Sequence, residues 1–180
     1  TALSLAALVI SQIFGNRALF FLGARFTAWS DPMMYLRMLT HIFAHSSISH
    51  YTGNFMLILA VGPMVEEKYG SPRLAGMMAI TAVVTGLINA IFFKNIVLVG
   101  ASGVVFMLIL LASFVNLREG KFPLTVLLVA VFFSGNELVT GVMSTDSISQ
   151  MGPIIGGLCG GTFGMVINRG KMSSNGGSTL

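Results

Sequence analysis

The chain has 180 residues, of which 54% are hydrophobic and only 9% are charged, and its formal net charge is +4. Soluble domains carry about 25% charged residues, so the composition excludes an ordinary soluble protein and indicates an integral membrane protein. The positive charge forms no basic stripe, which argues against nucleic-acid binding and makes it a marker of membrane topology. The single cysteine, Cys159, rules out a disulfide framework and a thiolate metal site.

The first 49 residues divide into an apolar stretch and a mixed stretch. Residues 1–15 predict a first transmembrane helix, clipped at its start; a signal peptide is the alternative, but no basic region precedes the stretch and no cleavage site follows. In residues 16–49 arginines alternate with aromatic residues, which is typical of an element lying in the headgroup region. Asp31-Pro32 predicts a turn or a helix start inside it.

Five further transmembrane helices are predicted from apolar runs near the ~20 residues that cross ~30 Å of hydrocarbon. They cover residues 50–65, 74–93, 101–117, 122–141 and 148–168. The tail, 172–180, is rich in serine and glycine and is expected to be disordered. The sequence therefore predicts one all-α membrane domain, 1–171, that forms a bundle of six transmembrane helices.

The distribution of basic residues predicts the orientation of this bundle. Six spans place both termini on one side of the membrane, and the short loops of that side contain Lys68, Arg73, Arg118, Lys121, Arg169 and Lys171. Basic loops stay in the cytoplasm, so we expect cytoplasmic termini, with Ser102 near the outer side. The short loops and the lack of extra domains favour a bacterial inner membrane.

Two polar groups interrupt the apolar sequence. Ser102 lies in Gly100-Ala101-Ser102-Gly103 at the start of a predicted helix, where a serine either caps the helix or takes part in chemistry. His50 and Asn54 are four residues apart and therefore share one face of another helix, which starts from the same side of the membrane. Together with the Ser102 backbone N–H, these two side chains would suit a developing oxyanion.

The other histidines, His41 and His45, allow two further interpretations. With His50 they could form a metal site, but no carboxylate or cysteine accompanies them, and we expect no metal or cofactor. A structural role, in which they bond the backbone where the loop meets the helix, is favoured for both.

These residues resemble the motifs of the rhomboid family of intramembrane serine proteases. The similarity lies in the spaced arginine, histidines and asparagine of 37–54, the turn 67–71, the Gly100–Gly103 motif and the paired glycines 156–157 and 160–161. It implies a six-helix bundle with a water-filled cavity open to the outer side, a serine–histidine dyad, and substrates that are transmembrane segments of other proteins in the lipid bilayer.

The resemblance also implies a role for each site residue. Ser102 would be the nucleophile, and His50, Asn54 and the Ser102 amide would form the oxyanion hole. Thr40, His41 and His45 would belong to the framework around the site.

The chain departs from the family pattern at the general base. In the family this histidine lies on the sixth helix just before the paired glycines, but here no histidine follows His50. The alignment places Pro153 at that position, and a shift of one residue would place Ile154 there. Neither side chain accepts a proton, so we expect a rhomboid fold with little or no proteolysis.

Several functions remain open at this stage. The chain could be a protease with another base, or a pseudoprotease that binds transmembrane segments without cutting them. A channel or transporter is the third alternative, but only Glu137 is a charge within a span. Pro153 could be natural or engineered. Glycines at 152, 156, 160 and 164 predict close packing of the sixth helix on the serine helix, so the fold should survive the loss of the base.

Overall fold

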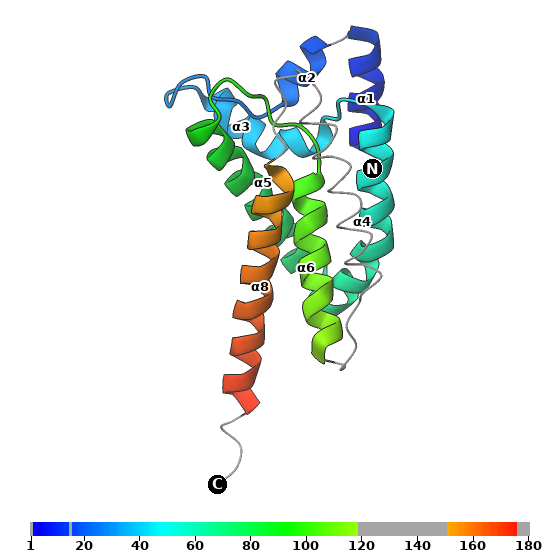
Figure 1. The fold of residues 1–180 in the computed structure, drawn as a ribbon, viewed down its shortest axis with the longest axis vertical. Coiled ribbons are helices and arrows are strands. Elements are labelled where there is room, and N and C mark those ends of the chain that lie inside the picture. The colour runs from blue at the N-terminus through cyan, green and yellow to red at the C-terminus, as the bar shows by residue number, and fades with distance from the viewer. Residues whose placement is uncertain (1, 15, 119–150, 176–180) are drawn as a thin grey trace.

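The computed structural model describes residues 2–14, 16–118 and 151–175 (Figure 1). Its helices are α1 (Ala2–Phe14), α2 (Asn16–Leu22), α3 (Pro32–Thr40), the 3₁₀ turn η1 (His41–Phe43), α4 (Ile48–Tyr69), α5 (Ser71–Phe92), α6 (Ser102–Arg118) and α8 (Gly152–Asn175). Extended segments in these ranges meet only in an isolated bridge between Ala24 and Leu98. The described residues therefore confirm the expected all-α class.

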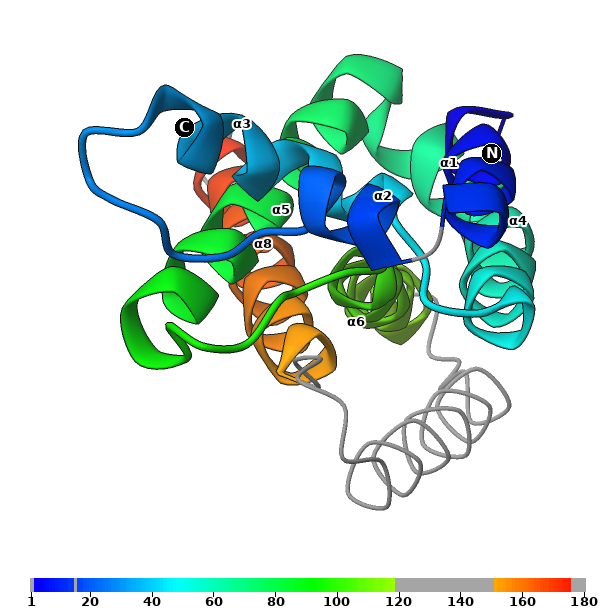
Figure 2. The same cartoon turned by 90° about the horizontal axis from the view of Figure 1, so that it is seen from above.

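Helix α6 lies at the centre of the bundle, with α4, α5 and α8 around it (Figure 2). Its apolar residues face these neighbours on several sides, as expected for a helix that is hydrophobic all round. The largest core cluster joins α4, α5 and α6 and consists of Val61, Val65, Leu74, Met77, Val104, Met107, Leu108, Leu111 and Ala112. This packing fixes the first turn of α6 at the end of the bundle where α2 and α3 lie (Figure 1).

Two local signals in the sequence set helix ends, and the first of them, Asp31-Pro32, is a helix start that the sequence analysis predicts. Asp31 is the N-cap of α3, where its Oδ1 accepts a hydrogen bond from the Met33 N–H at 2.9 Å, and Pro32 occupies the first turn. Helix α4 ends at Gly70, which has φ of +83° and whose N–H donates to the Glu66 carbonyl at 2.7 Å.

The membrane spans are confirmed only in part. Among the described helices, α5 alone is long and apolar enough to cross a membrane, and α1, α6 and α8 contain shorter apolar stretches. The span predicted at 122–141 lies outside the described residues. The six-helix bundle therefore stays a prediction.

Several predicted helix bounds are wrong. Residues 16–22, expected in an interfacial loop, form α2 directly after α1. Helix α4 extends beyond the predicted 50–65 to Tyr69, because solvated charged residues continue a helix until Gly70 stops it. Helix α8 begins at Gly152 rather than 148 and continues to Asn175, so residues 172–175 are helical rather than disordered. A single glycine such as Gly170 is tolerated within a helix.

Candidate active site

Ser102 is the first residue of α6, and its side chain is buried, with 7% of the residue exposed. The loop before it turns at Gly100, whose φ of +105° favours glycine. The Gly100 N–H donates to the His41 carbonyl at 3.0 Å, which ties this loop to η1. Within the described part of the chain, the Ser102 hydroxyl makes no hydrogen bond, so it does not cap α6 and its oxygen is available for other contacts.

His50 and Asn54 face the same loop from the first turns of α4. A Cβ atom at Gly100 would lie 2.5 Å from both Cε1 and Nε2 of His50, and 3.7 Å from Nδ2 of Asn54. Asn54 is completely buried, and neither atom of its amide finds a hydrogen-bond partner among the described residues. The fold therefore brings His50 and Asn54 together beside the turn that leads into Ser102, and it leaves a buried N–H donor there ready for a ligand.

Helix α8 contacts the opposite side of Ser102. A Cβ at Gly152 would lie 2.9 Å from the Ser102 Oγ, and one at Gly160 would lie 2.5 Å from the Met107 carbonyl oxygen. The tightest approach is at Gly156, where a Cβ would collide with the Gly103 carbonyl group. Glycine at these three positions therefore allows the close packing of α8 on α6 that the sequence predicts.

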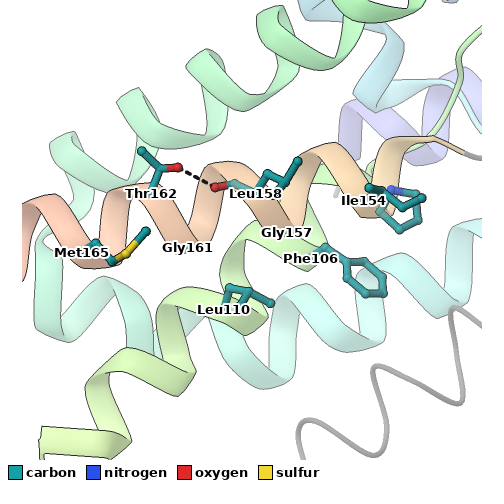
Figure 3. A pocket seen from close by; sticks show the side chains of 9 residues that line it. Phe106, Leu110, Ile154, Gly157, Leu158, Gly161, Thr162 and Met165 are labelled. Carbon is teal, nitrogen blue, oxygen red and sulfur yellow. Dashed lines mark hydrogen bonds between the residues drawn. The ribbon is translucent and has the colours of Figure 1, made fainter.

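Pro153 follows Gly152 and is buried, whereas Ile154 is 51% exposed. Position 153 thus lies on the inner side of the first turn of α8, next to the residue that contacts Ser102. Pro153 is also one of the residues that line an apolar groove of about 500 Å³ between α6 and α8. Figure 3 shows the groove running from Ile154 past Phe106 and Leu158 to Met165.

Comparison with known proteins agrees with this geometry, since the model of the Rhomboid domain matches residues 32–170. The chain belongs to the rhomboid family. It is 30% identical over 140 residues to rhomboid-like protease 1 of Toxoplasma gondii, covering 74% of this chain and 47% of that protein. It is 29% identical over 124 residues to rhomboid protease GluP of Bacillus subtilis, and the match covers 67% of this chain and 24% of that protein. It is 26% identical over 127 residues to RHOMBOID-like protein 6, mitochondrial, of Arabidopsis thaliana, and the match covers 68% of this chain and 41% of that protein.

The chain thus spans less than half the length of these relatives. As a member of the rhomboid family it is an integral membrane protein with the scaffold of an intramembrane serine protease.

The two histidines before α4 make hydrogen bonds within the rhomboid framework. His41 Nε2 lies 3.1 Å from the Ala82 carbonyl oxygen of α5, and His45 Nδ1 lies 3.0 Å from the Ser4 hydroxyl of α1. Both residues lie between α3 and α4, outside the membrane-spanning helices. Burial lowers the pKa of His41 to about 4, and burial together with the nearby His50 lowers the pKa of His45 to about 3. Both rings are therefore neutral at pH 7.

No group of three metal-binding side chains occurs in the ranges that the structure describes. His45 instead packs against other rings, with centroid distances of 5.1 Å to His50 and 5.5 Å to Tyr51. Cys159 is half-buried on α8.

Two functional contacts were missed from the sequence, and both involve serines. Ser46 bonds the His50 ring, with 3.2 Å between Oγ and Nδ1, and Ser4 bonds the His45 ring across 41 residues. Ser46 precedes His50 by four residues, and this spacing is a signal from which the hydrogen bond could have been predicted. The Ser4 contact has no local signal, because it depends on how α1 packs.

Proposed function

We propose that this rhomboid binds transmembrane segments of other membrane proteins at Ser102 and cleaves them very slowly or not at all. The observation that carries the proposal is the approach of α8 to Ser102, where Gly152 contacts the hydroxyl and Pro153 is the next residue. A serine hydroxyl is a weak nucleophile unless an adjacent base removes its proton, and proline has no group that could do so.

The oxyanion side of the site supports retained binding of a peptide carbonyl. In this proposal the His50 ring, the Asn54 amide and the Ser102 backbone N–H surround the carbonyl oxygen of the peptide bond. Asn54 is buried, and its amide has no hydrogen-bond partner among the described residues, so a carbonyl oxygen would satisfy a group that otherwise costs free energy. Preorganised donors of this kind are each worth about 10²–10³ in rate when the rest of the machinery is present.

Without the base, these donors supply only a residual rate. In serine hydrolases the loss of one member of the catalytic set lowers kcat by roughly 10⁴–10⁶, leaving what the oxyanion hole and binding provide. The chain would then act as a pseudoprotease that holds transmembrane segments. Pro153 is buried and Ile154 is exposed, which favours Pro153 as the position of the missing base.

The proposed orientation follows from charge. Lys68 and Arg73 lie at the α4–α5 turn, at the end of the bundle away from Ser102. Basic loops favour the cytoplasm, so the termini would be cytoplasmic and the site would open to the outer side, in a bacterial inner membrane.

The test compares four purified proteins in liposomes with a fluorescent transmembrane substrate. These are the chain as given, Pro153→His, Pro153→Ala and the double variant Pro153→His/Ser102→Ala. We expect cleavage by Pro153→His alone, because only this variant supplies a base next to Ser102. Pro153→Ala controls for the removal of the proline ring, and the double variant shows that cleavage depends on the serine.

A second readout separates binding from cleavage. Crosslinking of the same transmembrane peptide should be equal for the chain as given and for Ser102→Ala, because the hydroxyl is not needed for binding. Rapid Ser102-dependent cleavage by the chain as given would refute the proposal, since another group would then act as the base. Absence of crosslinking would refute the binding role.

A further inference from the structure

His50 is held by two consecutive serines, one on its backbone and one on its ring. Ser47 is the N-cap of α4, and its hydroxyl accepts from the His50 N–H at 3.0 Å. Ser46 lies one residue earlier, and its Oγ is 3.2 Å from Nδ1 of the His50 imidazole. Because the cap fixes the backbone between them, the ring and the Ser46 hydroxyl meet at a defined angle.

A neutral imidazole carries its single proton on one nitrogen, and a serine hydroxyl at Nδ1 fits either tautomer, because it can donate to this nitrogen or accept from it. A hydroxyl that donates to Nδ1 leaves the proton on Nε2. The Cε1–Nε2 edge of His50 is the edge that faces Gly100, within 2.5 Å of where a Cβ would be. With the proton on Nε2, the ring presents a donor toward the turn that leads into Ser102. With the proton on Nδ1, the ring would present a lone pair there, which would repel a carbonyl oxygen or an oxyanion.

We propose that the Ser46 hydroxyl donates to Nδ1 of His50, which makes Ser46 a positioning residue that holds the Nε2–H tautomer and aims this N–H at the Gly100–Ser102 turn. The use of that N–H for a substrate carbonyl rests on the proposed function, but the tautomer itself does not. Among the described residues, the Ser46 hydroxyl bonds the His50 ring, so Ser46 acts through that ring.

The neighbouring histidine is engaged elsewhere. The Ser4 hydroxyl donates to the Phe43 carbonyl at 2.8 Å, so it accepts the Nδ1–H of His45 at 3.0 Å. The His45 and His50 rings meet edge to face, with centroids 5.1 Å apart. His45 therefore supports the His50 ring by packing, while its ring proton is directed toward Ser4.

The direct test is NMR of protein labelled with ¹⁵N-histidine in detergent micelles, in which protonated and unprotonated ring nitrogens have separate signals. The series comprises the chain as given, Ser46→Ala, Ser46→Thr and Ser49→Ala. Ser49 is an exposed serine of the same segment whose hydroxyl makes no hydrogen bond within the described residues, so it is the matched control. Assignment of the His50 signals uses His50→Asn.

In the chain as given, in Ser46→Thr and in Ser49→Ala, we expect His50 to carry its proton on Nε2. In Ser46→Ala we expect a mixture of both tautomers, because the group that selects one is gone. An Nδ1–H tautomer in the chain as given, or an unchanged tautomer in Ser46→Ala with retained thermal stability, would overturn the inference.

A kinetic arm in the Pro153→His background adds a functional readout. Ser46→Ala should lower kcat about tenfold with KM nearly unchanged, the effect of one lost hydrogen bond on a transition-state donor, and Ser46→Thr should restore it. An unchanged kcat in Ser46→Ala would overturn the role of Ser46 in positioning. If Pro153→His does not cleave, the missing base is not the whole defect of the site, and the NMR comparison still decides whether Ser46 sets the tautomer.

Discussion

Substitution of Gly156 by alanine should loosen the contact between α8 and α6. The added Cβ would lie 2.5 Å from the carbonyl carbon of Gly103 and 2.6 Å from its Cα, whereas ordinary contacts begin near 3.4 Å. The atoms met are backbone, so no side chain can turn away. The Gly103 carbonyl oxygen would be closer still, so the two helices must separate by more than about 1 Å. A gap of about 1 Å already forfeits roughly half of each dispersion contact across the interface.

The size of the effect follows from two opposing terms. Overpacking of this kind costs about 1–3 kcal/mol, and alanine returns up to about 1 kcal/mol through its better helix propensity. We expect a net loss of about 1–2 kcal/mol in the free energy of unfolding. For a chain of this length, each kcal/mol shifts Tm by roughly 2–4 °C.

Gly157 provides the matched control, because a Cβ at the next residue would meet nothing within 4 Å. Cys159 provides the assay: it is the single cysteine of the chain and lies half-buried on α8, so its labelling by a thiol-specific fluorophore reports the opening of this helix. Thermal scans in detergent should show a lower Tm for Gly156→Ala and an equal or higher Tm for Gly157→Ala. Equal shifts for both variants would refute the packing argument.

Three more predictions concern the site. Gly100→Ala should destabilise the fold by about 1–3 kcal/mol, because a φ of +105° is strained for alanine and the added Cβ would meet the His50 ring. Gly76→Ala is the control and should be nearly neutral in the same thermal scans, because its Cβ would lie in open space. In the Pro153→His background, Asn54→Leu should lower kcat by about 10²–10³ without lowering Tm, because the buried amide, which has no hydrogen-bond partner among the described residues, is replaced by an apolar side chain. A matching loss of Tm would argue for a structural role. The free energy of unfolding should fall as the pH drops below about 6.5. The pKa of His45 is lowered to about 3 in the folded protein, so below pH 6.5 the unfolded chain binds more protons than the folded one. A constant Tm between pH 7 and 5 would contradict this.

The sequence predicted the parts of the site that depend on local rules. The helix start at Asp31-Pro32 and the start of α6 after Gly100 follow from capping and glycine chemistry. The shared face of His50 and Asn54 follows from their spacing on a helix. Their proximity to Ser102 was inferred from the shared side of the membrane and from the family resemblance, because spacing within one helix says nothing about a second.

Other features depend on packing between distant segments and could not be read in advance. The burial of Pro153 and the exposure of Ile154 depend on the rotation of α8, which is set where Gly156 meets Gly103. The separate helix α2 was missed because the alternation of arginine and aromatic residues fits an interfacial loop and a short helix equally well.

The bond between Ser4 and His45 has a consequence for where this domain begins. The family model matches from residue 32, so a boundary drawn from similarity alone would discard α1. Yet the Ser4 hydroxyl holds both the His45 ring and the Phe43 carbonyl, directly before the helix that carries His50 and Asn54. The smallest piece of the chain that holds His50 and Asn54 in place therefore includes α1. A version shortened to the matched region should become less ordered around these two residues before its hydrophobic core is lost.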